Sequence, residues 1–220
     1  MPSSFTPHFF KNTHNGFTLV ELMVTIAIFA IITSVVVSKN SDFNSTILLT
    51  NLAYETALTI REAQVYGLNV KKSGTGNEAD FRSGFGVHFD LSNPKQFKLF
   101  SDRIVSGTNS GNKAYDNNDN TIQTFEISRG NYLYRLCLVD SGFLNNYNCL
   151  NFNQNITTAN VVFTRPEPDA VIKTTPQGAP ASKLEIVLAS PSGSKRKVVV
   201  STSGAISVDN CLTPNDLACR

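Results

Sequence analysis

An uninterrupted apolar segment near the N-terminus dominates the pattern of hydrophobic and polar positions along the chain. Between Phe17 and Ser38 this segment contains no Gly, no Pro and a single charged residue, Glu21. At about 1.5 Å per helical residue the segment spans roughly 33 Å, which is enough to cross the apolar core of a bilayer. We therefore predict a membrane-spanning helix that carries one carboxylate about one turn from its start.

The helical pattern continues beyond Lys39 and becomes amphipathic. Apolar side chains recur there at helical spacing, with Asn51 and Arg61 as polar exceptions on the same stripe. The apolar positions are Ile47, Tyr54, Leu58, Val65 and Leu68. Gly67 is the first helix breaker, so the sequence allows one long helix over Phe17–Tyr66, its second half packed on a sheet. The alternative is that the segment is divided into three parts: a membrane anchor, a linker near "SKNSDFNST" and an independent second helix.

After a predicted loop at residues 71–80, short segments rich in β-branched and aromatic residues alternate with turn residues. Three local pairs are expected: Phe85–Asp90 with Lys95–Asp102, Thr121–Ser128 with Tyr132–Val139, and Lys183–Ser190 with Lys195–Thr202. Further strands are expected at "NVVFTRP" and "GAISV". Strands in direct succession indicate an antiparallel sheet, so the predicted fold class is α+β.

Composition and charge narrow the range of functions. With 220 residues the chain suits one globular domain plus an appendage, and its net charge of +2 predicts no strong attraction to nucleic acid or anionic lipid. The absence of a CxxC spacing and the scatter of the three histidines argue against a zinc site. No nucleophile, phosphate-binding or paired-carboxylate motif occurs, so we do not expect an enzyme.

The residues at the start of the apolar segment form a specific motif. Gly-Phe-Thr-Leu-x-Glu, from Gly16 to Glu21, followed by an apolar helix, resembles the class III signal of type IV prepilins and pseudopilins. The resemblance implies that a membrane aspartyl peptidase cuts between Gly16 and Phe17, and that the new Phe17 amine is N-methylated. A secretory signal would instead place its cleavage site after the apolar core.

The same resemblance implies a role in assembly for Glu21. Its carboxylate can reach the Phe17 ammonium of a neighbouring subunit in a helical filament. Each charge is costly alone in an apolar bundle, and pairing offsets that cost. A subunit docked one step out of place would leave both charges unmatched, so the pair would set the register of the filament.

The implied architecture is the pilin fold, a long N-terminal helix packed on an antiparallel β-sheet or β-sandwich. Expected divisions are a leader at 1–16, a transmembrane or filament-core helix at 17–39, an amphipathic half at 40–70 and an extracytoplasmic β-rich domain at 71–220. The strand order resembles the GspH/FimT-like group, through Phe85–Asp90, Val161–Ala170 and Lys197–Val208. Major type IVa pilins generally carry a proline midway along the apolar helix, and its absence favours a minor pilin or pseudopilin.

These features predict a structural subunit of a type IV pilus or a type II secretion pseudopilus. The expected location is the bacterial cytoplasmic membrane, crossed once with the globular domain outside the cytoplasm, and then the filament. The implied partners are other pilin or pseudopilin subunits, the prepilin peptidase/N-methyltransferase, the inner-membrane assembly platform and membrane lipid. Two alternatives are a DNA-binding minor pilin of natural transformation and an enzyme that this helix merely anchors.

Oxygen ligands concentrate in the short segment "YDNNDNT". Asp116, Asn118 and Asn120 stand at alternate positions and match the start of a calcium loop, although the glycine and final glutamate of an EF-hand do not follow. The alternative is a solvated turn, because Asn and Asp are good turn formers. Asp102 and Glu126 complete a calcium site only if the fold brings them close. Calcium is the one cofactor that the sequence suggests.

The four cysteines suit disulfide bonds in a domain outside the cytoplasm. Pairing of Cys137 with Cys149 and of Cys211 with Cys219 is favoured because it is local, although three connectivities exist.

The basic run Lys195, Arg196 and Lys197 is a candidate phosphate contact, or else a solvated hairpin edge that blocks aggregation. The Gly-Arg-x-Arg stretch of DNA-binding FimT-like pilins is absent from the corresponding turn, Ser203–Val208.

Overall fold

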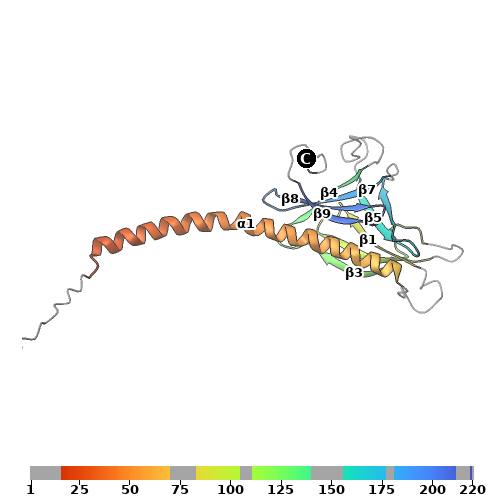
Figure 1. Cartoon of the computed structure of the whole chain (residues 1–220), viewed down its shortest axis with the longest axis horizontal. Coiled ribbons are helices and arrows are strands. Elements are labelled where there is room, and N and C mark those ends of the chain that lie inside the picture. The colour runs from red at the N-terminus through yellow and green to blue at the C-terminus, as the bar shows by residue number, and fades with distance from the viewer. Residues whose placement is uncertain are drawn as a thin grey trace, which may run out of the picture. The chain divides into compact units, whose positions relative to one another are not determined.

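The computed structural model in Figure 1 describes residues 16–69, 83–104, 111–139, 156–176, 181–211 and 219, with only the helical backbone described at 38–43. The chain divides into two compact units, Met1–Ser41 and Asp42–Arg220. The predicted loop at 71–80 lies outside the described residues, as does Cys149.

A single helix, α1, covers Leu19–Leu68, without the break that a linker near residues 38–46 would introduce. The helix therefore ends two residues later than the sequence predicted and includes Gly67. In the N-terminal unit, Leu19–Val37 has a mean hydropathy of 2.5, and none of it is buried. A span of 19 such residues is long and apolar enough to cross a membrane.

The described residues of the second unit form two antiparallel sheets (Figure 1). The five-stranded sheet has the order β3-β2-β1-β5-β6 and the four-stranded sheet the order β4-β7-β8-β9. The strands are β1 (Gly84–Asp90), β2 (Gln96–Asp102), β3 (Asn120–Glu126), β4 (Tyr132–Val139), β5 (Thr158–Phe163), β6 (Ala170–Thr175), β7 (Lys183–Ala189), β8 (Lys195–Ser201) and β9 (Ile206–Asn210). The predicted α+β class is confirmed.

Two of the three predicted hairpins are confirmed, because β1 pairs with β2 and β7 pairs with β8. The third prediction was wrong: β3 pairs with β2, whereas β4 pairs with β7 in the other sheet. A turn does form there, since the Asn131 N–H donates to the Ser128 carbonyl, 3.2 Å away. It carries the chain from one sheet to the other, because β3 and β4 belong to different sheets.

Strand β6 was not predicted. It follows a proline-containing connection and completes the five-stranded sheet by pairing with β5 along its whole length. Its side chains are mostly half-buried or exposed, so its sequence lacks the apolar run that marks the other strands.

The core of the second unit lies between α1 and the inner faces of both sheets. The helix contributes Leu49, Leu52, Ala53, Ile60 and Ala63 to the largest buried cluster, together with side chains from both sheets. The predicted packing face of the helix was therefore wrong. Ile47, Tyr54, Leu58 and Val65 are all exposed, and Leu68 is only partly buried.

Small side chains explain why α1 packs by this face. A Cβ added at Gly67 would lie 2.5 Å from the Phe163 carbonyl oxygen, so the helix backbone almost touches β5. The Gln64 amide, also on this side, donates to the Pro168 and Gly204 carbonyls at 3.2 and 3.1 Å. Close approach of helix and sheet favours Ala and Gly over bulky residues, which sequence periodicity alone does not reveal.

Candidate functional site

The N-terminus of α1 is organised by a threonine cap. The Thr18 hydroxyl accepts a hydrogen bond from the Glu21 N–H at 3.2 Å, and its carbonyl accepts one from the Leu22 N–H at 3.1 Å. The first bond satisfies one of the N–H donors that every helix start leaves unpaired, and the second is the first i→i−4 bond of the helix. The sequence analysis missed this cap, although Thr followed three residues later by Glu is the spacing of a capping box.

The cap places the Glu21 side chain in the first turn of α1. The positive end of the helix dipole lies there, so an acidic residue is favourable at this position even in a lone chain. The capping bond uses the backbone of Glu21, which leaves the carboxylate available for another partner. The geometry is consistent with the assembly role expected for Glu21, which stays a prediction.

Gly16 has no structural reason to be a glycine in the folded chain. A Cβ built on it would meet nothing within 4 Å, and its backbone is not in the left-handed region. The neighbouring Phe17 side chain is exposed. A requirement for glycine at 16 would therefore come from whatever enzyme recognises the segment, and the predicted cleavage between Gly16 and Phe17 meets no obstacle in local structure.

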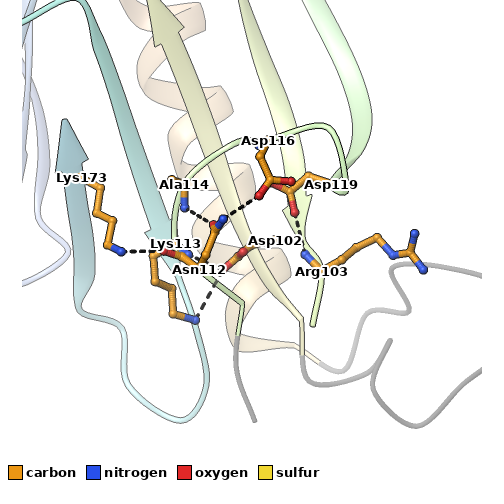
Figure 2. A network of polar contacts seen from close by, with 8 residues as sticks. All are labelled: Asp102, Arg103, Asn112, Lys113, Ala114, Asp116, Asp119 and Lys173. Carbon is orange, nitrogen blue, oxygen red and sulfur yellow. Dashed lines mark hydrogen bonds and ion pairs between the residues drawn. The ribbon is translucent and has the colours of Figure 1, made fainter. Parts of the chain in front are cut away.

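The segment predicted to bind calcium belongs to a loop that is bonded to itself and to the sheet (Figure 2). The Asp116 carboxylate accepts from the Asn112 side-chain amide at 2.6 Å and from the Asn118 N–H at 2.7 Å. The Asp119 carboxylate accepts from the N–H groups of Arg103 and Asp116, both at 2.9 Å. All four oxygens of these two carboxylates thus already accept hydrogen bonds from the chain.

Contacts with neighbouring strands fix the same loop over the five-stranded sheet. The Lys173 ammonium on β6 donates to the Asn112 carbonyl at 2.6 Å (Figure 2). The Tyr115 ring lies 4.8 Å from the His88 ring, and the Tyr115 N–H donates to the Asn160 side chain at 3.1 Å. The loop is therefore a packed part of the domain.

The buried carboxyl of Asp102 lies beneath this loop. Its Oδ2 accepts from the Lys113 N–H at 3.1 Å and is 3.6 Å from the Lys113 ammonium. Burial raises the pKa of Asp102, against the opposing effect of Lys113. Burial likewise raises the pKa of Asp119, and Asp102 and Asp116 add to that rise. The loop thus brings three carboxyl groups near one another.

Of the two carboxylates that could complete a calcium site, Asp102 lies next to the loop and Glu126 does not. Glu126 lies at the far end of β3 and pairs with Gln96, whereas Asn120 begins that strand opposite Ser101. Among the described His, Cys, Asp and Glu residues, no group of three or more is arranged to hold a metal ion. Calcium binding through Asp116, Asn118 and Asn120 stays a prediction.

Two members of the basic run on β8 are engaged within the chain. The Lys197 ammonium lies 3.3 Å from a Glu185 carboxylate oxygen, and both side chains are largely buried. Lys195 donates to the Cys219 carbonyl at 2.6 Å and lies 4.0 Å from the centre of the Tyr134 ring. Arg196, between them, is half-buried.

The three cysteines that the structure describes, Cys137, Cys211 and Cys219, belong to a small cluster beside the four-stranded sheet. Cys211 and Cys219 form a disulfide, and both pack against a small cluster that includes Cys137 and Val187. Cys137 is also disulfide-bonded. Its expected partner, Cys149, lies outside the described residues.

Comparison with known proteins bears on the N-terminal segment. No curated protein and no solved structure matches the chain. Residues 11–37 match the prokaryotic N-terminal methylation motif, and this range includes Gly16, Phe17, the Thr18 cap and Glu21. On the evidence of this segment, the match supports the type IV pilin and pseudopilin class for the chain.

Proposed function

We propose that the chain is a structural minor pilin or pseudopilin, a subunit of a type IV pilus or of a type II secretion pseudopilus. It is made as a precursor, cut between Gly16 and Phe17 and N-methylated on Phe17. The GspH/FimT-like group is the subgroup that the strand order favours. The work of such a subunit is mechanical, and no catalytic role is proposed.

One observation carries the proposal: the methylation motif over residues 11–37 includes the whole of the exposed apolar segment Leu19–Val37 and the residues just before it. A soluble domain would bury nineteen such residues, whereas no part of Leu19–Val37 is buried inside the structure. The proposed locations supply the missing apolar environment, first in the inner membrane as a single span and then in the core of the filament.

The proposed partners follow from the same segment. The prepilin peptidase and N-methyltransferase act on Gly16 and Phe17, and the inner-membrane assembly platform and other subunits receive the mature helix. Glu21 pairs with the Phe17 ammonium of a neighbour, which removes two unpaired charges from an apolar bundle.

The cleavage step is tested with the full chain expressed beside a prepilin peptidase. We expect the native chain to lose its first sixteen residues and to gain one methyl group. Gly16→Leu should leave uncut precursor in the membrane, because the fold tolerates the added side chain whereas the peptidase does not. Intact mass spectrometry distinguishes these products. Native protein that retains its first sixteen residues in assembled filaments would refute the proposal.

The assembly step is tested separately with Glu21→Gln. The capping bond uses the Glu21 backbone N–H, so this substitution keeps the helix start and removes only the charge. We expect normal cleavage and reduced recovery in sheared filaments, and Glu21→Ala should behave in the same way. Native recovery of both variants would contradict the register role of Glu21.

The second candidate, a DNA-binding minor pilin, has less support. It depends on Lys195, Arg196 and Lys197, and the first and last of these are held by Cys219 and Glu185. Gel-shift binding at low salt that disappears when the three positions are neutralised would favour it.

A further inference from the structure

A cavity of about 380 Å³ lies between residues of the two sheets, on the side where β4 forms one end of the four-stranded sheet. We refer to it as the edge cavity. It is lined by two residues that follow β1, three residues of β4 and two residues that precede β5. These are Leu91, Ser92, Tyr134, Arg135, Leu136, Ile156 and Thr157. The edge cavity shares no residue with the N-terminal motif or with the loop network around Asp102.

Three of the lining residues are apolar and join the cavity to the core. Leu136 and Ile156 are 2 and 4% exposed and belong to the largest buried cluster, against which Leu91 packs. The Leu91 N–H donates to the Thr157 carbonyl at 2.8 Å, and the turn between β1 and β2 also accepts a bond from the β4 backbone at 2.8 Å. This turn is thereby bonded to both sheets, so the cavity is formed without a ligand.

A β-bulge in β4 positions the charged residue of the lining. Leu133 and Leu136 both belong to the core cluster, although residues three apart on a regular strand point to opposite faces. The register of β4 against β7 shifts between Leu133 and Arg135, which makes Tyr134 the extra residue. The Arg135 guanidinium lies 5.2 Å from the centre of the Tyr134 ring. Bulges commonly re-aim side chains in this way next to active sites.

Arg135 gives the edge cavity a positive charge that no described carboxylate neutralises. The side chain is half-buried, and lysines make the two ion pairs found among the described residues. No lining residue is acidic. The Lys195 ammonium, 4.0 Å from the centre of the Tyr134 ring, adds a second positive charge nearby. A guanidinium binds a carboxylate through two parallel N–H···O bonds, so this environment favours an anionic ligand of that kind.

We propose that the edge cavity binds a small apolar carboxylic acid. The carboxylate pairs with Arg135, and the hydrocarbon or aromatic part of the acid lies against Leu91, Leu136 and Ile156. Ligand pockets typically combine an apolar wall with a few polar groups and measure roughly 300–1000 Å³. The edge cavity is at the small end of that range, which suits a free acid better than the end of a peptide.

A titration of the full chain in non-ionic detergent with para-fluorophenylacetate, followed by fluorine NMR, tests the site. The neutral para-fluorophenylacetamide has nearly the same shape and is the matched control ligand, and empty micelles correct for partition into detergent. We expect the acid to bind at least about tenfold more tightly than the amide, because only the acid pairs with the guanidinium. Acetate should displace the acid at least about tenfold less well than phenylacetate does, because acetate lacks the apolar part.

Two arginine variants locate the binding within the chain. Arg135→Gln should weaken binding of the acid at least about tenfold and should leave binding of the amide within about twofold of the native chain. Arg165→Gln is the matched control, because Arg165 is also half-buried and lies outside the lining. It should leave both affinities within about twofold. Circular dichroism checks that each variant is folded, and the comparison of acid with amide on the native chain needs no variant.

Three results would overturn the inference: equal binding of acid and amide, native affinity in Arg135→Gln, or an equal loss in Arg165→Gln. Acetyl-glycyl-phenylalanine presents the same carboxylate and ring at the end of a peptide. We expect it to displace the acid at least about tenfold less well than phenylacetate does, and equal displacement would assign the cavity to a chain terminus and overturn the free acid. None of these measurements depends on cleavage after Gly16, so failure of the proposed function would leave this inference unaffected.

Discussion

The assignment of the two helix faces leads to a quantitative prediction from two neighbouring substitutions. Ile60 is fully buried beneath the sheets, whereas Leu58, two residues earlier on the same helix, is 69% exposed. Ile60→Ala and Leu58→Ala remove similar apolar groups from the same element. Their effects on folding should therefore differ almost entirely through burial.

The expected magnitudes follow from the packing. Ile60 belongs to the largest core cluster, so its truncation leaves a cavity and should lower the free energy of unfolding by about 3 kcal/mol. For a domain of this size, that loss corresponds to a fall in Tm of roughly 6–12 °C. Leu58→Ala leaves no cavity and should change stability by less than about 0.5 kcal/mol.

Urea unfolding of the full chain in detergent measures both values. The chain contains no Trp and six Tyr, so far-ultraviolet circular dichroism and tyrosine fluorescence are suitable signals. Equal m values for the native chain and the variants would show that the same surface is exposed on unfolding. If Leu58→Ala were the more destabilising change, the helix would be packed by the opposite face, and the fold described here would be wrong.

Two further predictions concern the globular unit. Burial raises the pKa of Asp102 from its ordinary value of 3.8, so between that value and the raised one the folded chain binds more protons than the unfolded chain, and stability falls as pH rises. Asp102→Asn should therefore gain stability relative to the native chain as the pH rises above about 4 in urea titrations, and a constant difference would contradict the reasoning. Gly193→Ala and Gly204→Ala both place a side chain at positive φ, which costs about 1 kcal/mol. Only the Cβ at Gly204 would lie 2.3 Å from a carbonyl oxygen, so thermal unfolding should show at least twice the loss there, and equal losses would show that the turn relaxes.

Local signals in the sequence predicted the positions of most strands well, but they predicted less well which strands pair with one another. The hairpins around Asn93 and Gly193 were predictable because the turn residues separate strands of similar burial. The turn at Arg129–Asn131 has equally strong turn chemistry and positive φ values at Arg129 and Gly130. It joins exposed β3 to largely buried β4, and which sheet each strand enters is decided by contacts distant in sequence.

The packing face of α1 could not be predicted from periodicity, because the helix has two apolar faces. The stripe of Ile47, Tyr54, Leu58 and Val65 contains the larger side chains, so it gave the stronger pattern. The buried face contains Ala and Thr, whose small size allows close contact with the sheet. The fit of these small side chains depends on the shape of the sheet surface, which forms only when the chain folds. The periodicity of apolar residues along the sequence does not contain this information.

The processing motif was predictable because it is contiguous. Gly16, Phe17 and Glu21 lie within six residues, and the match over residues 11–37 depends on local sequence alone. The network around Asp102 and Lys113 was not predictable in the same way, since it joins β2 to a loop about ten residues further along the chain. Its charges acquire their environment only when the loop folds over the sheet.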